Sequence, residues 1–249
     1  MLVNIQIGQI LDLSSIGSLP TSGQSLDYCQ TMQQRRRRRN RNQTQLPDRS
    51  QVQLWSNQRL SSVLVMECSS TQIVADYLVD IINIIRQSNL TVLWALRFAD
   101  FWNKGITCTE IIQMLILQAL QVNPQAIHNN GGTLTVANFR EVENEEGWFA
   151  ILNRALSGVP QVYLIIDGGI LGHATGYDRS TATRWLSRFS QNLSCIVKVV
   201  ICASTIDEKY AATAWSPDAW MKMHIPIPKR RLALNIRRRR QRRSTEKGS

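Results

Sequence analysis

An aspartate at the end of an apolar run carries the clearest chemical signal in this sequence. Residues 162–166 are apolar without interruption and include β-branched and aromatic types, which predicts a strand buried on both faces. Asp167 follows directly, at the carboxyl end of that strand, where open parallel sheets place their ligand sites. The competing role for this side chain is to start a turn with Gly168 and Gly169, and we favour the turn.

A hydroxyl-rich loop is the second candidate for chemistry. Ser69, Ser70 and Thr71 lie between a predicted strand at 63–66 and a strongly apolar predicted helix at 72–87. Hydroxyl side chains at this position accept hydrogen bonds from the first free amides of a helix. We therefore interpret the three hydroxyls primarily as helix caps.

The elements that would position these residues alternate between strands and helices. Such alternation predicts right-handed crossovers and an α/β fold, with a parallel sheet of about four to five strands covered by helices on both faces. The sequence favours a short strand at 134–139, a glycine-rich loop at 168–178 and a strand-like segment at 223–228. The other predicted strands are 91–98 and 196–203, and the other predicted helices are 109–121, 148–156 and 180–192.

The composition divides the chain into three parts. Residues 1–60 form an N-terminal extension that we expect to be mostly disordered, because 14–50 is rich in Ser, Gln, Asn, Arg and Pro. A short strand at 3–7 and a short helix at 51–59 are the predicted exceptions. The α/β domain spans 61–225, and a basic tail occupies 226–249.

Most of the basic charge is concentrated in two arms. The formal net charge is +11, yet the chain outside the two arginine clusters is slightly acidic. Clusters of this density are read by nuclear import receptors, neutralise nucleic-acid phosphates, or are only solvated, and all three roles stay open. The basic residues are Arg35, Arg36, Arg37, Arg38, Arg39 and Arg41 in the first arm, and Lys229, Arg230, Arg231, Arg237, Arg238, Arg239, Arg240, Arg242 and Arg243 in the second.

The cysteines and histidines point to an intracellular protein without a metal site. The five cysteines include no CxxC pair, and Cys68, Cys195 and Cys202 lie in apolar runs, as small buried residues of a reducing compartment do. The three histidines are isolated. No apolar run approaches the roughly 20 residues that cross a bilayer, so we expect a soluble cytoplasmic or nuclear protein with no membrane partner.

Four segments together resemble a known family of nucleotide switches. In order and spacing, they are similar to the core of a P-loop regulatory NTPase, and most closely to the degenerate fungal branch of the NACHT and STAND group. This resemblance implies a nucleotide-gated oligomerisation switch, and it places Ser69, Ser70, Thr71 and Asp167 at a remnant nucleotide site. The segments are residues 61–96, 110–124, 145–167 and 197–204.

The chain departs from the family where phosphate would bind. Residues 66–72 contain neither the glycines nor the lysine of a phosphate-binding loop. Holding a non-glycine residue at positive φ costs roughly 1–2 kcal/mol per position. Glu67 would add about 4 kcal/mol of repulsion at about 4 Å and an effective dielectric of about 20. Ile170 and Leu171 occupy the place of the acidic pair that would polarise water, and neither side chain can act as a base.

We therefore expect a non-catalytic regulatory or protein-interaction module with an unidentified protein partner and no cofactor. One alternative is an NTP-binding enzyme that holds ATP or GTP with Mg²⁺ at Ser69, Ser70, Thr71 and Asp167. Another is a nuclear or nucleic-acid-binding protein that acts through its arginine-rich arms.

Overall fold

The structure is a computed structural model of the full chain. It describes residues 8–10, 18–39, 49–68, 70–99, 105–127, 134–207, 215 and 219–225, and these ranges are the described part of the chain. The expected strand at 3–7, Ser69, Arg41 and the basic tail from residue 226 lie outside the described residues.

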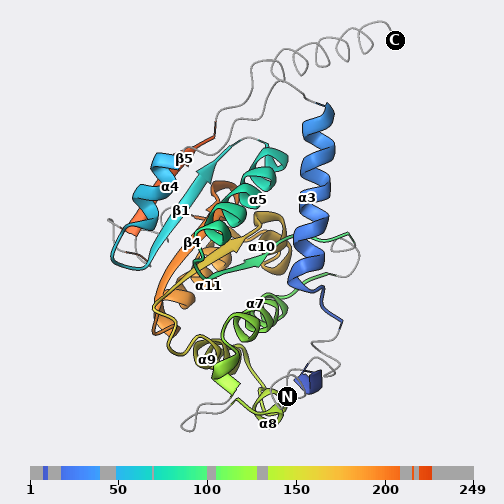
Figure 1. The fold of residues 1–249 in the computed structure, drawn as a ribbon, viewed down its shortest axis with the longest axis vertical. Helices are drawn as coiled ribbons and strands as arrows, with labels where there is room; N and C mark the ends of the chain where they lie inside the picture. The colour runs from blue at the N-terminus through green and yellow to red at the C-terminus, as the bar shows by residue number, and fades with distance from the viewer. Residues whose placement is uncertain are drawn as a thin grey trace, which may run out of the picture.

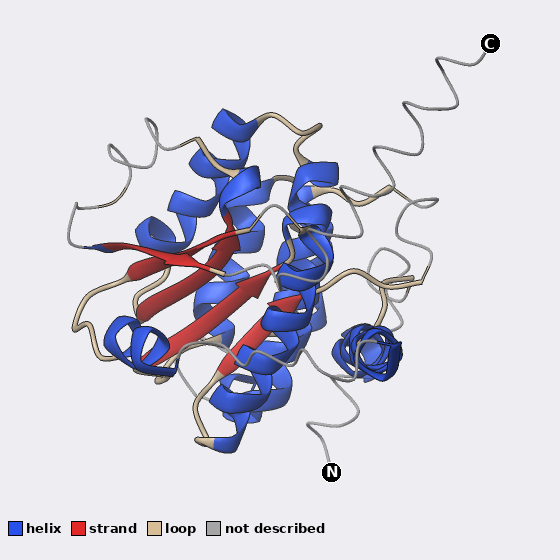
Figure 2. Ribbon diagram, turned by 90° about the horizontal axis from the view of Figure 1, so that it is seen from above, coloured by secondary structure: helices blue, strands red, loops and turns tan. Residues whose placement is uncertain are grey.

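A five-stranded sheet forms the centre of the molecule, in the order β2-β3-β4-β1-β5, and all its strand pairs are parallel (Figures 1 and 2). This arrangement confirms the α/β fold expected from the sequence. The strand β2 is shorter than the predicted 91–98 because the chain leaves the sheet after Ala95. The strands are β1 (Ser62–Glu67), β2 (Val92–Ala95), β3 (Gln161–Ile166), β4 (Ile196–Cys202) and β5 (Trp220–His224).

Helices cover both faces of the sheet and give it two apolar cores (Figure 2). Alternate residues of a strand face opposite cores: in β1, Val63 and Val65 belong to one core, while Leu64 and Met66 belong to the other. Since β1, β3 and β4 are each buried on both faces, they read in the sequence as continuous apolar runs. One face carries α3 (Ser22–Arg39), α4 (Arg49–Ser56) and α5 (Thr71–Gln87), and the other carries α7 (Cys108–Val122), α9 (Glu145–Ala155), α10 (Gly168–Ala174) and α11 (Arg179–Asn192).

Side-chain caps fix where several helices begin. Thr107 and Glu110 form a reciprocal capping box at the start of α7, and Asn144 caps α9. A second capping box, between Thr135 and Asn138, starts helix α8 (Val136–Arg140). The strand expected at 134–139 is therefore wrong, because this local cap favours a helical turn over the extended backbone that Val136 suggests.

The loop expected at 168–178 is also wrong. Asp167 caps the short helix α10, whose two leading glycines had suggested a flexible turn. The glycines allow close packing instead, since a Cβ on Gly168 would lie 2.7 Å from Thr205 Cγ2. Only the end of the segment turns, through Gly176 and Tyr177 at positive φ.

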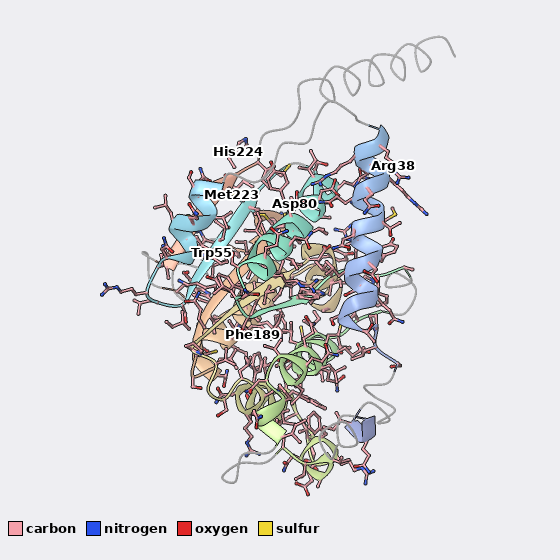
Figure 3. All side chains as sticks on the ribbon, in the orientation of Figure 1. Arg38, Trp55, Asp80, Phe189, Met223 and His224 are labelled. Carbon is pink, nitrogen blue, oxygen red and sulfur yellow. The ribbon has the colours of Figure 1, made fainter. Side chains whose placement is uncertain are left out.

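A helix replaces the disordered arm over residues 22–39. Helix α3 packs along α5, with Arg38 near its carboxyl end (Figures 1 and 3). It buries Leu26, Cys29 and Gln33, whose spacing places them on one helical face. Two arginines of the basic run are held by α5: Arg36 forms an ion pair with Asp76, and Arg37 forms one with Asp80 at 2.6 Å. The expectation of disorder fails here because the acidic partners lie on a different element, about forty residues further along.

Strand β2 forms one edge of the sheet, and a side chain of α7 covers part of its backbone. Gln118 Nε2 donates to the carbonyl of Trp94 at 2.7 Å, and the amide of Trp94 donates to Gln118 Oε1 at 2.9 Å. The amide side chain thus makes the two bonds that a neighbouring strand would make, which protects this edge from pairing with another chain.

Candidate functional site

The order of the strands makes the carboxyl ends of β1 and β4 the position where a ligand is expected. From β1 the chain crosses to β2 at one edge of the sheet, whereas from β4 it crosses to β5 at the other edge. Open α/β sheets bind ligands where neighbouring strands diverge in this way. The described residues at this carboxyl edge are Glu67 at the end of β1, Cys68, Ser70 and Thr71 after it, Asp167 after β3, and the short helix η2 (Ala203–Thr205) after β4.

The hydroxyl-rich loop makes only part of the contacts expected of it. Ser70 is the N-cap residue of α5 with an extended backbone, but its side chain makes no cap hydrogen bond. Its amide donates instead to Cys68 Sγ at 3.4 Å. Thr71 is exposed in the first turn, and the nearby Ile73 and Val74 amides donate to the Ser70 carbonyl, each at 3.1 Å. The capping interpretation is therefore confirmed for the position of Ser70 but is wrong for its hydroxyl.

A carboxylate lies where this loop begins. Glu67, the last residue of β1, has a side chain that is 38% exposed and forms an ion pair with Lys222 of β5 at 3.4 Å. The lysine of a phosphate-binding loop would approach the ligand, whereas Lys222 neutralises a carboxylate of the protein itself.

Asp167 is buried, and both of its carboxylate oxygens accept hydrogen bonds. Arg97 donates from Nε to Oδ2 at 2.7 Å and from Nη2 to Oδ1 at 2.9 Å, a bidentate geometry. The amide of Gly169 also donates to Oδ1, at 2.7 Å, which makes Asp167 the cap of α10. The side chain of Asp167 is only 2% exposed. Asp167 therefore serves as a helix cap, and not as the start of the turn expected at Gly168 and Gly169.

Arg97 is the one site residue that the sequence reasoning missed. Arg97 lies two residues after β2, and Asp167 directly follows β3. Because Ala95 of β2 pairs with Ile166 of β3, the pairing of these two strands brings Arg97 beside Asp167. Burial lowers the pKa of the Arg97 guanidinium, but the charge of Asp167, its hydrogen bonds and smaller contributions from Cys29 and Tyr28 together offset this and raise the pKa overall. The available signal was a lone arginine at the end of a predicted strand.

The arrangement does not fit a magnesium ion. Mg²⁺ is usually held through one or two carboxylates and the phosphates of a substrate, but here a guanidinium already engages the oxygens of Asp167. Among the described residues, no group of three or more His, Cys, Asp or Glu side chains could hold a metal ion.

The segment after β4 lies at the same carboxyl edge of the sheet and is held by local bonds. Thr205 Oγ1 donates to the carbonyl of Cys202 at 2.7 Å, and Cys202 Sγ lies 3.1 Å from Ser204 Oγ. Together with the close contact between Gly168 and Thr205, these local bonds fix η2 against α10. The polar side chains of Cys202, Ser204 and Thr205 are thus engaged with one another or with the backbone.

The two predicted clusters of basic residues are described only in part, and two of the described arginines are already paired. Arg36 and Arg37 are held by α5, whereas Arg35 and Arg38 are exposed on α3. The side chain of Arg39 and the residues from 229 to 243 lie outside what the structure describes. In the described part of the chain, no helix is both long enough and apolar enough to traverse a bilayer.

Comparisons with known proteins add no assignment to this geometry. No family model matches the chain, and a search of curated proteins finds no similar sequence.

Proposed function

We propose that this protein is a non-catalytic regulatory or protein-interaction module, built on an α/β scaffold of the P-loop NTPase kind that no longer binds nucleotide. The bidentate Arg97–Asp167 pair supports this proposal most directly. Asp167, at the carboxyl end of β3, acts as a structural ion-pair partner and helix cap, so a second role as a metal ligand would require the pair to break.

The other charges near the carboxyl edge support the same proposal. Glu67 is paired with Lys222, and on the neighbouring helix Asp76 and Asp80 are paired with arginines of α3. These acids have basic partners within the protein, so no cluster of free cations is left among them to attract a triphosphate. Because Glu67 and Lys222 neutralise each other, the attraction left for a phosphate at this loop is the roughly 1 kcal/mol that a helix N-terminus provides.

Two exposed leucines lie close to the start of β1. Leu54 and Leu60 are 63% and 70% exposed, and the buried Trp55 and the polar residues 56–59 separate them. Contiguous apolar patches are typical of contact surfaces for other proteins, and these leucines would form part of such a patch. The cysteines that the structure describes are all free, which supports an intracellular location.

A nucleotide titration tests the proposal. The full chain is titrated with a fluorescent ATP analogue in the presence of Mg²⁺, beside the variants Thr71→Val and Asp167→Asn. We expect no saturable signal at micromolar concentrations for any of the three proteins, and circular dichroism establishes that the variants are folded. Micromolar binding by the wild type that is lost in Asp167→Asn would establish the NTP-binding alternative instead.

The nucleic-acid alternative rests, within the described chain, on the exposed Arg35 and Arg38. Arg36 and Arg37 would first have to leave Asp76 and Asp80, which lowers the affinity available to a phosphate backbone. Retention on RNA across a salt series separates the two functions, because each phosphate contact adds to the salt dependence. An unchanged slope in Arg35→Gln/Arg38→Gln would count against this alternative.

A further inference from the structure

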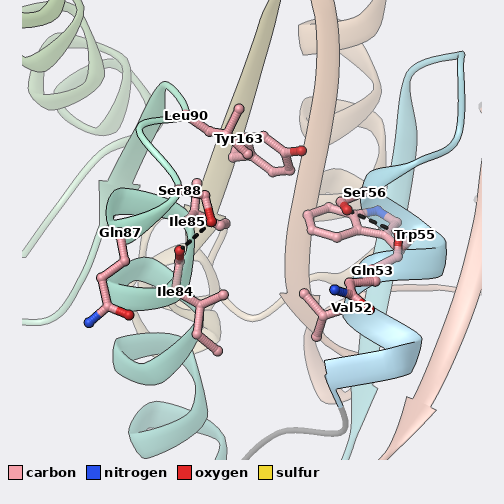
Figure 4. A pocket seen from close by; sticks show the side chains of 10 residues that line it. All are labelled: Val52, Gln53, Trp55, Ser56, Ile84, Ile85, Gln87, Ser88, Leu90 and Tyr163. Carbon is pink, nitrogen blue, oxygen red and sulfur yellow. Dashed lines mark hydrogen bonds between the residues drawn. The ribbon is translucent and has the colours of Figure 1, made fainter.

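A pocket with a charged lining lies beside the start of β2, where α3 begins and where α5 and α7 end. Its volume is about 540 Å³, and its walls are the first turns of α3, the turn from α5 into β2, and the last turn of α7. A hydrogen bond of 3.5 Å from Ser22 Oγ to Gln121 Oε1 joins two of these walls. The hollow between α4 and α5 differs, because its lining carries no charge and its rings, Trp55 and Tyr163, are buried (Figure 4).

Two opposite charges line the pocket between α3, α5 and α7 without partners. Asp27 of α3 and Arg86 of α5 are both exposed, and neither forms an ion pair within the described part of the chain. Their own helices offer no partner, because no basic residue lies three or four positions from Asp27 and no acidic residue lies at those spacings from Arg86. The pocket thus presents a carboxylate and a guanidinium, from different helices, to the same molecule.

The guanidinium of Arg86 rests on an aromatic ring. Its Cζ atom lies 5.7 Å from the centroid of the Trp94 ring, within the range of a cation–π contact. The ring is fixed in turn, since Trp94 Nε1 donates to the carbonyl of Ser22 at 3.1 Å. Trp94 is buried, so it supports Arg86 and leaves the contact with a ligand to the guanidinium. A guanidinium placed in this way loses less freedom when it binds a carboxylate.

Amide and apolar side chains complete the surface that the pocket offers. Asn89 and Gln121 are exposed, and a side-chain amide can both donate and accept hydrogen bonds. A peptide bond presents the same two functions. Leu90 and Val122 are 46% and 49% exposed, so they offer apolar surface to a ligand. The lining therefore matches a molecule that combines a carboxylate, an ammonium group, an amide and apolar side chains.

The volume limits the length of such a molecule. An apolar cavity of about 150 Å³ holds one benzene ring. On that scale, a pocket of about 540 Å³ has space for about 20 non-hydrogen atoms, the size of a peptide of two or three residues. A single amino acid would leave the side-chain amides without a partner, and a longer peptide would carry one of its charged ends out of the pocket.

We propose that the pocket between α3, α5 and α7 binds a free peptide of two or three residues with apolar side chains. The carboxylate of the peptide pairs with Arg86, its ammonium group pairs with Asp27, and its amide bonds with Asn89 or Gln121. The apolar side chains of the peptide contact Leu90 and Val122. This site is independent of the proposed loss of nucleotide binding, because it uses no residue of the carboxyl edge.

Four forms of one dipeptide test the proposal on the full chain: leucyl-leucine, its N-acetyl derivative, its C-terminal amide, and the form with both ends blocked. Binding is followed by ligand-observed NMR at increasing probe concentration. We expect saturable binding of leucyl-leucine, binding about two- to fivefold weaker when one end is blocked, and binding about four- to twentyfold weaker when both are, since each exposed ion pair contributes modestly. Absence of saturable leucyl-leucine binding, or equal affinity for the doubly blocked form, overturns the proposal.

Variants that remove one charge show whether each end of the peptide meets the side chain named. In Arg86→Gln, amidation of the peptide should no longer weaken binding, whereas acetylation should still do so; in Asp27→Asn the reverse should hold. Both side chains are exposed, so both variants should fold, which circular dichroism checks. The matched controls Arg154→Gln and Glu143→Gln remove exposed charges outside the pocket, and both effects should persist in them. An effect of amidation that is unchanged in Arg86→Gln, or an effect of acetylation that is unchanged in Asp27→Asn, overturns the proposal.

Discussion

Replacement of Arg97 by methionine offers a direct measure of how firmly Asp167 is committed to a structural role. The substitution keeps a side chain of similar length but removes both hydrogen bonds to the buried carboxylate. Removal of one partner from a buried ion pair costs roughly 3–5 kcal/mol, because the other charge is left unpaired. The Arg97 side chain is 22% exposed, so water screens part of the charge, and the Gly169 amide still holds Asp167. We therefore expect a loss of about 2–3 kcal/mol in the free energy of unfolding.

Urea denaturation followed by tryptophan fluorescence measures this loss by linear extrapolation. A double-mutant cycle with Asp167→Asn isolates the pair, since asparagine retains an oxygen for the Gly169 amide. We expect a coupling energy of at least about 1.5 kcal/mol. The matched control is Glu146→Gln, whose ion pair with Arg188 spans 3.5 Å and whose side chain is 79% exposed, and it should cost less than about 0.5 kcal/mol. Coupling below about 0.5 kcal/mol between Arg97 and Asp167 would refute the reasoning.

Three further predictions concern stability at other sites. Burial lowers the pKa of Lys198 from 10.5 to about 8, so between these pH values the unfolded chain binds more protons than the folded one. The free energy of unfolding of the wild type, relative to that of Lys198→Met, should therefore rise by about 1.4 kcal/mol per pH unit over that window. Urea denaturation at several pH values measures this rise. Gln118→Ala should cost about 2–3 kcal/mol, because the amide and carbonyl of the Trp94 backbone lose their partner. Gln121→Ala, on the exposed side of the same helix, should cost less than about 0.5 kcal/mol, and equal losses would contradict the edge-protection role. The double variant Asp76→Asn/Asp80→Asn should speed amide hydrogen exchange throughout α3 by roughly tenfold or more, because two ion pairs hold this helix on α5. Hydrogen exchange followed by mass spectrometry measures the change. Unchanged exchange would show that the apolar contacts of α3 are enough to hold it.

The sheet could be predicted from the sequence because its central strands are buried on both faces. The apolar run at 162–166 lies within β3, and the run at 196–203 corresponds to β4 with one residue fewer at the end. Helix boundaries that depend on local caps could also be predicted closely: the helix expected from residue 109 begins at Cys108, directly after its cap Thr107. These signals are contained within a few consecutive residues, so one sequence is enough to read them.

The misplaced elements depend on contacts that a single stretch of sequence does not contain. Helix α3 is polar over most of its surface, and its order comes from Asp76 and Asp80 on α5. Helix α10 contains glycines because it packs against Thr205, which lies beyond the next strand. In both cases composition suggested an irregular segment, whereas tertiary contacts stabilise a helix.

The candidate site was predicted in its position but not in its chemistry. The carboxyl edge of the sheet follows from the pattern of strands, and Asp167 lies there as expected. The partner of Asp167 could not be predicted, because Arg97 reaches it only once β2 pairs with β3. The role of an isolated carboxylate thus depends on which strand becomes its neighbour.

The position of β1 in the sheet has a consequence for how the chain folds as it is synthesised. Ser62 at the start of β1 bonds with Lys198 of β4, and 136 residues separate the two in sequence. At ribosomal rates of about 5–20 residues per second, β1 therefore waits roughly 7 to 27 seconds before its inner neighbour exists. During that time α5 can shield one side of the strand, while the other remains open to chaperones or to aggregation. We expect refolding to be slow and the yield to fall steeply with concentration, because both neighbours of β1 are strands far along the chain.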